Sequence, residues 1–119
     1  MCRLLKELED WGCNTQTALF NVMGDKDFYR ELLKRFLKDP SVNDLRQAVR
    51  KGDLSTAINA SHEIKGTTAI LGLDPLNYEV SNFLDVIRDG KINRDQLQSK
   101  YRPVEKQLTI CYGILGNMR

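Results

Sequence analysis

Apolar residues recur along most of this chain at intervals of three and four positions, and strand-like alternation is nearly absent. The clearest stripe lies in residues 74–90 and consists of Leu76, Val80, Phe83, Leu84 and Ile87. Asp74 can cap this helix, Pro75 suits its first helical position, and Gly90 is placed to end it. A second seam begins after Asn93 and consists of Leu97, Tyr101, Val104, Leu108, Cys111 and Leu115. The pattern therefore favours an all-α fold.

Residues 24–52 also have the spacing of a long helix, with Asp25 as its cap and Gly52 as its stop. Its expected buried residues are Phe28, Leu32, Phe36, Leu45 and Val49. Pro40 threatens the continuity of this helix, because proline lacks an N–H and disfavours the helical conformation of the residue before it. We expect a split near Asp39. Pro103 lies inside the last seam and predicts a kink or a short break there.

The helix between these two regions begins near Asp53 and ends at Gly72. Its inward stripe is Leu54, Ile58, Ser61, Ile64, Thr68 and Leu71. A short N-terminal helix is indicated by Leu4, Leu5, Leu8 and Trp11, and a further turn by Thr15, Ala18, Leu19 and Val22. Short loops favour antiparallel neighbours. The sequence thus predicts one domain, 1–119, built as an antiparallel up-and-down four-helix bundle with short additional N-terminal helices.

Composition narrows the classes of function. A chain of 119 residues with 41% apolar and 29% charged residues is typical of one globular domain. The formal net charge of +2 is too small to indicate nucleic acid or a membrane surface as a partner, and no apolar run approaches the length of a membrane span. The three cysteines lack CxxC spacing, which fits reduced thiols in the cytoplasm, and one histidine leaves a zinc site without ligands. We expect a cytoplasmic protein without a metal.

The only histidine, His62, lies about 100° around its helix from Ser61, at the edge of the buried face or outside it. Its neighbours on the outer surface are Ser55, Asn59, Lys65, Gly66 and Ala69. A merely solvated helix surface would carry more Glu, Lys and Arg, and Gly66 costs roughly 1 kcal/mol relative to Ala. Such a low surface would let another protein approach the imidazole of His62.

Each residue alone has an ordinary explanation. A lone histidine is more often a packing residue, Lys65 could be solvated, and Gly66 could let a neighbouring helix come close. Together they are compatible with phosphoryl transfer, because neutral imidazole is a nucleophile near neutral pH and can attack an acyl phosphate. Lys65, one turn along, could offset the phosphoryl charge. The sequence contains no Walker loop, kinase-like Gly-rich loop or carboxylate cluster, so the phosphoryl group would come from a partner that supplies a carboxylate and a metal.

The motif HxxKGxxxxxG, formed by His62, Lys65, Gly66 and Gly72, resembles the signature of histidine-containing phosphotransfer (HPt) domains. The preceding segment MGDKDFYRELLKRF also resembles that family, as do the stretch from Leu45 to Asp53 and the pair Leu84-Asp85. The resemblance covers about residues 19–90. This sequence departs from the family pattern at Ser61, where Ala is frequent, and at Ile64, where Leu is usual.

The resemblance implies a phosphoryl carrier, not a kinase, in a two-component phosphorelay. His62 would be the phosphoacceptor, Lys65 would steady the phosphoryl group, and Gly66 would leave room for a response-regulator receiver domain. We extend the expected docking surface to Asn59 and Ala69. The receiver would bring the aspartate and Mg²⁺, so the chain needs no cofactor of its own. Expected partners are receiver domains and a hybrid sensor histidine kinase, and we expect a monomer because the motif face must stay accessible.

Two other hypotheses stay open. The chain could be a helical adaptor that binds a signalling partner without phosphorylation, in which case exposed apolar residues such as Phe20, Val42 or Ile70 would matter more than His62. It could also be an enzyme with His62 as a general base, although no Ser, Cys or carboxylate is obviously paired with that histidine.

Overall fold

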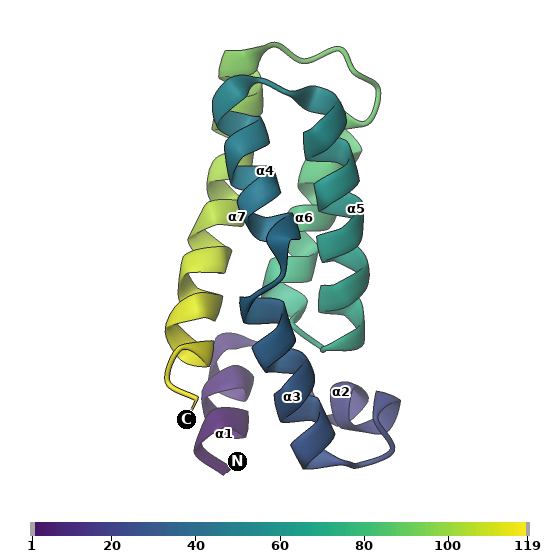
Figure 1. Ribbon diagram of the computed structural model, residues 1–119, viewed down its shortest axis with the longest axis vertical. Helices are drawn as coiled ribbons and strands as arrows, with labels where there is room; N and C mark the ends of the chain where they lie inside the picture. The colour runs from purple at the N-terminus through teal and green to yellow at the C-terminus, as the bar shows by residue number, and fades with distance from the viewer. Residues whose placement is uncertain (1, 119) are drawn as a thin grey trace.

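The computed structural model describes residues 2–118, which form seven helices and no strand (Figure 1). The helices are α1 (Cys2–Trp11), α2 (Thr15–Asn21), α3 (Lys26–Leu37), α4 (Pro40–Lys51), α5 (Leu54–Ile70), α6 (Asp74–Ile87) and α7 (Arg94–Leu115). The molecule measures 43 × 23 × 22 Å along its principal axes. The prediction of an all-α fold is confirmed. Within the described range, no helix is both long and apolar enough to cross a membrane.

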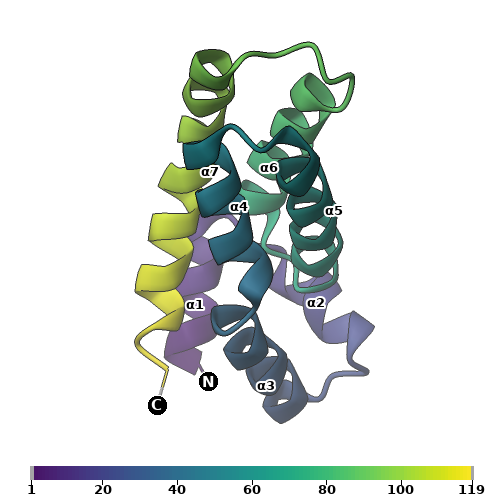
Figure 2. The ribbon, with the colours of Figure 1, turned by 45° about the horizontal axis from the view of Figure 1, so that its top comes forward.

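The four helices α4 to α7 surround one core. α4 packs against α5 and α7, and α6 packs against the same two helices, so the contacts close into a cycle (Figures 1 and 2). Successive helices of this cycle run in opposite directions (Figure 1). Each helix contributes fully buried side chains to the core, among them Leu45, Ile64, Leu76 and Leu108. Burial of these apolar surfaces is the main force that holds the helices together.

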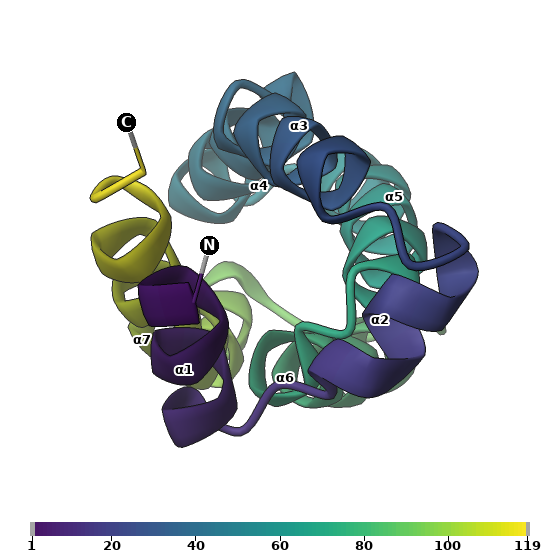
Figure 3. The same ribbon diagram turned by 90° about the horizontal axis from the view of Figure 1, so that it is seen from below.

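The remaining helices α1, α2 and α3 gather at one end of this cycle, as the view from below shows (Figure 3). α1 packs against α2 and α7, and α3 packs against α2 and α7. Trp11 of α1 donates a hydrogen bond from Nε1 to Oε1 of Gln107 in α7, at 2.8 Å. The short N-terminal helices expected from the sequence are therefore present, and they close one end of the core.

Side-chain caps begin three of the helices where the sequence predicts them. The carboxylates of Asp25 and Asp53 accept hydrogen bonds from the backbone N–H of Phe28 and Thr56, which starts α3 and α5. Asn93 starts α7 with a reciprocal capping box. These bonds are local in sequence, so the pattern of capping residues suffices to predict them.

The two prolines have different effects. Pro40 is the first residue of α4, and Asp39 caps that helix with an extended backbone at ψ 122°, so the predicted split between residues 24 and 52 is confirmed. Pro103, in contrast, lies inside the continuous helix α7, so of the predicted kink or short break, the break is wrong. Pro103 and Ser99 are both exposed, so the Ser99 carbonyl that loses its helical donor can bond to water instead.

Three further expectations are wrong in detail. Asp74 is not a cap but the first residue of α6, because the Leu73 carbonyl already accepts the first helical hydrogen bond, from the N–H of Asn77. Phe28 is 45% exposed, and the buried residues of α3 are Tyr29, Leu33 and Phe36. Val42 is 1% exposed and belongs to the core, so it cannot serve as an exposed adaptor residue.

α4 and α7 are also joined by a polar contact. The Arg46 guanidinium donates to both Glu105 carboxylate oxygens, at 2.9 and 3.0 Å, and the Tyr101 hydroxyl donates to Glu105 at 2.9 Å. Desolvation raises the pKa of Glu105, but the hydrogen bonds from Arg46, Tyr101 and Thr109, together with the positive charge of Arg46, leave this pKa below its ordinary value. The folded state therefore favours the ionised form of Glu105.

Candidate functional site

His62 lies in the middle of α5, on the side of that helix that faces away from the core. The inward side of α5 is buried and consists of Ala57, Ala60, Ser61, Ile64 and Thr68. His62, Asn59, Gly66 and Ala69 are all exposed, and Lys65 is half-buried at the edge of the inward face. The residues predicted from the sequence to form the acceptor and its surroundings therefore share one accessible face of α5.

Gly66 has no internal role that would require glycine. Its backbone is helical, and a Cβ atom built on it would have no heavy atom within 4 Å beyond its own helix backbone and chain neighbours. A helical glycine costs about 1 kcal/mol relative to alanine. Neither packing nor backbone conformation explains this cost, so the alternative that Gly66 admits a neighbouring helix of the same chain is wrong.

The second glycine of the motif, Gly72, is required by the fold. Its φ is +68°, which favours glycine, and an added Cβ would clash with the Asn14 carbonyl oxygen. The Gly72 carbonyl also accepts a hydrogen bond from the Asn14 N–H at 2.9 Å. Gly72 thus ends α5 where the loop before α2 touches it.

Side chains from two N-terminal helices hold the last carbonyls of α5. Asn21 of α2 donates from Nδ2 to the Ile70 carbonyl at 3.0 Å, and Tyr29 of α3 donates from its hydroxyl to the Leu71 carbonyl at 2.7 Å. Burial raises the pKa of the Tyr29 hydroxyl well above its ordinary value, so this donor keeps its proton. These contacts satisfy carbonyl groups that a helix end leaves without partners.

The carboxylate next to the histidine is directed towards α4. The Ser41 hydroxyl, at the start of α4, donates a hydrogen bond to Glu63, and the Ser41 N–H is held by the Asp39 carboxylate at 2.9 Å. Lys65 has no carboxylate within ion-pair distance in the described part of the chain. The ammonium group of Lys65 is therefore able to pair with an anion from outside.

Exposed apolar side chains lie at the C-terminal end of the same helix. Ile70 is 55% exposed, and the bond from Asn21 to its carbonyl brings α2 alongside, where Phe20 is 83% exposed and Met23 95% exposed. The sequence pointed to Phe20 and Ile70 as exposed, and the structure confirms both. The sequence did not predict the exposure of Met23, which extends from the turn after α2.

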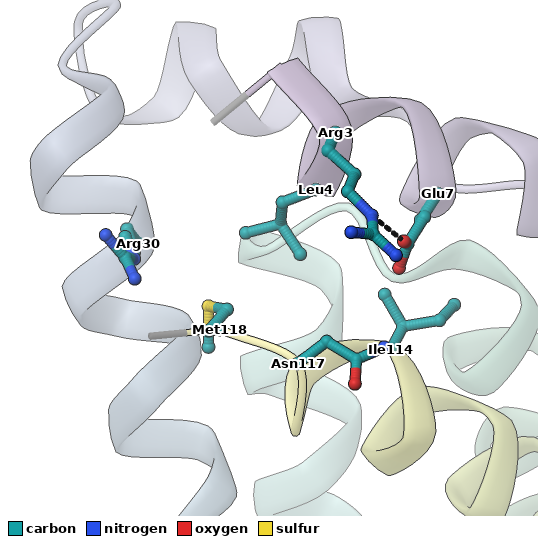
Figure 4. A pocket seen from close by; sticks show the side chains of 7 residues that line it. All are labelled: Arg3, Leu4, Glu7, Arg30, Ile114, Asn117 and Met118. Carbon is teal, nitrogen blue, oxygen red and sulfur yellow. Dashed lines mark hydrogen bonds and ion pairs between the residues drawn. The ribbon is translucent and has the colours of Figure 1, made fainter.

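A surface pocket of about 200 Å³ lies elsewhere, between α1, α3 and the end of α7 (Figure 4). Its lining includes Arg3, Glu7, Arg30 and Met118, and Arg3 donates to the Glu7 carboxylate at 3.1 Å. His62 is not part of this lining. Across residues 2–118, no group of three or more His, Cys, Asp or Glu side chains is arranged to hold a metal ion.

Comparisons of the chain with family models, with curated proteins and with solved structures give no match.

Proposed function

We propose that this chain is a histidine phosphotransfer protein, in which His62 carries a phosphoryl group between the aspartates of response-regulator receiver domains. In this proposal α4 to α7 are the antiparallel four-helix bundle of the HPt family, and the protein acts as a monomer in the cytoplasm. The observation that carries the proposal is the pairing of an exposed imidazole at His62 with a helical glycine at Gly66 that has only open space around it.

The proposed reaction is a direct transfer. A ring nitrogen of neutral His62 attacks the phosphorus of the receiver's aspartyl phosphate, and a P–N bond forms as the P–O bond breaks. The aspartyl carboxylate leaves with the bonding electrons, and the other ring nitrogen of the imidazole releases its proton to solvent. Lys65 offsets charge on the phosphoryl oxygens, while the receiver contributes Mg²⁺. The reverse reaction passes the group to another receiver.

Docking of the receiver is supported by the shape of the face around His62. Asn59, Gly66 and Ala69 are short, so they leave the imidazole accessible to a flat partner. Ile70 adds exposed apolar area at the end of α5, and Phe20 and Met23 are exposed in and after α2, which bonds to the Ile70 carbonyl. Burying such area is a main source of binding free energy.

Intact-mass measurement tests the proposal directly. The protein is mixed with a receiver domain charged by acetyl phosphate in the presence of Mg²⁺, with His62→Gln and the exposed-surface variant Asn82→Ala alongside. We expect one acid-labile phosphoryl group on the wild type and on Asn82→Ala, and none on His62→Gln. Failure of several unrelated receivers to phosphorylate the wild type would count against the relay.

That outcome would favour the second candidate, a helical adaptor that docks a partner without phosphorylation. The exposed Phe20, Met23 and Ile70 are the observation that supports it. For an adaptor, His62→Gln should retain partner binding while Ile70→Lys should abolish it. A relay would lose phosphotransfer with the first variant whether or not binding persists.

A further inference from the structure

One side chain of α6 reaches the backbone of α5 within the motif. Asn77 donates from Nδ2 to the Lys65 carbonyl at 2.9 Å and to Oγ1 of Thr68 at 3.0 Å. The Thr68 hydroxyl in turn lies 2.8 Å from the Ile64 carbonyl, to which it donates. Thr68 is buried and Asn77 is half-buried, so these bonds are partly shielded from competing water.

The position of this contact matters because of the residue that follows Lys65. The Lys65 carbonyl belongs to the peptide group that joins Lys65 to Gly66, and glycine gives that part of the helix its greatest conformational freedom. An additional donor from another helix restrains the same peptide group. Glycine at position 66 keeps the surface uncrowded but makes the helix backbone less rigid there, and the hydrogen bond from Asn77 restores part of that rigidity.

We propose that Asn77 is a positioning residue of the phosphoryl site. By holding the Lys65–Gly66 peptide against α6, it fixes the point from which the Lys65 side chain extends towards a phosphoryl group on His62. This inference rests on the proposed function, in which His62 carries the phosphoryl group, and it assigns a role to a residue outside the motif.

The test labels His62 without any receiver. Phosphoramidate transfers its phosphoryl group to a ring nitrogen of histidine: its P–N bond breaks, a P–N bond to the imidazole forms, and the displaced nitrogen leaves as ammonia with the ring proton. The chain has a single histidine, so a phosphohistidine signal in a ³¹P NMR spectrum reports on one position. The readout is the apparent pKa of the phosphoryl group, obtained from a pH titration carried out at a temperature well below that of unfolding.

A nearby cation favours the doubly ionised phosphoryl group and so lowers this pKa. Lys65→Met should raise it by about half a pH unit, the size expected for a close but solvated charge pair. Asn77→Ala should raise it in the same direction by at least about 0.2 unit, because the ammonium is then less well placed. The double variant should equal Lys65→Met alone, since Asn77 acts only through Lys65. Asn82→Ala, an exposed position on α6, should match the wild type.

A purely structural role for Asn77 predicts a lower unfolding temperature with an unchanged titration, and that result would overturn the inference. An unchanged titration in Lys65→Met would overturn it as well. Asn77→Ser, which shortens the donor, replaces the alanine variant if that variant does not fold. The relay is judged separately, by transfer from a charged receiver, so a protein that no receiver phosphorylates would contradict the proposed function while the chemically labelled protein still tests Asn77.

Discussion

Replacing Gly66 by alanine should make the protein more stable. The added methyl group would meet no heavy atom within 4 Å beyond the local helix, so it neither clashes nor gains packing, and the change reduces to helix propensity, about 0.8–1.0 kcal/mol in favour of alanine. For a domain of this size, that corresponds to an increase in unfolding temperature of roughly 4 °C. In urea unfolding followed by circular dichroism, the midpoint should rise by about 0.5 M with an unchanged slope.

The chain offers a matched control at Gly113. This glycine is also helical, exposed and surrounded by open space, but it lies in α7 and outside the motif. Gly113→Ala should therefore stabilise the protein by a similar amount. If Gly66→Ala lowers the free energy of unfolding while Gly113→Ala raises it, Gly66 has an internal packing role and is not there to keep a docking surface open.

The functional half of the experiment uses a larger side chain. Gly66→Gln should also keep or slightly raise stability, yet slow transfer from a charged receiver by about tenfold, equivalent to about 1.4 kcal/mol of lost docking free energy. Gly113→Gln should transfer at the wild-type rate. Unchanged or higher stability together with slower transfer in Gly66→Gln is a result that a purely structural glycine cannot give.

Four other substitutions test the structure, three of them next to the site and one in the contact between α4 and α7. Ser61→Ala should raise the free energy of unfolding by up to about 1 kcal/mol, because the Ser61 hydroxyl is buried without a hydrogen-bond partner among the described residues. Thr68→Val should lower the free energy of unfolding by about 1–3 kcal/mol, because the Thr68 hydroxyl is hydrogen-bonded. A lower free energy of unfolding for Ser61→Ala in denaturant would contradict the first expectation. Gly72→Ala should lower the same quantity by more than 1 kcal/mol, because of its positive φ and the close carbonyl oxygen, and wild-type stability in that variant would show that the turn relaxes. The contact between Glu105 and Arg46 should stabilise the protein fully above pH 4.5, the ordinary pKa of Glu105, and lose its effect as the pH falls through the lower folded-state pKa. The difference in unfolding temperature between wild type and Glu105→Gln should accordingly shrink below pH 4.5, and a difference that stays constant down to pH 3 would exclude this linkage.

The parts of the fold that sequence could predict are those fixed by local chemistry. The caps at Asp25, Asp53 and Asn93 involve residues three positions apart, so the residue types reveal them. The split at Pro40 follows from the missing N–H of proline. The outward direction of His62 follows from the helical period once the apolar stripe of α5 is known.

The errors arise where distant contacts decide. Tyr29 rather than Phe28 is buried because α3 is a separate helix whose orientation is set by packing, and Tyr29 reaches a carbonyl 42 positions away. Asn77 has no periodic signal at all, since its role depends on α6 lying against α5. Met23 is exposed because the turn after α2 directs it outward, which residue type alone would not suggest.

The anchoring of the end of α5 has a consequence for shortening the chain. The carbonyl groups of Ile70 and Gly72 accept donors from Asn21 and Asn14, both in the first 24 residues. A truncated chain that began at Lys26 would keep helices α3 to α7 but leave those two carbonyl groups to water. The first two helices are therefore not a dispensable extension, because this part of the molecule supplies the hydrogen-bond donors that hold the end of the histidine-bearing helix.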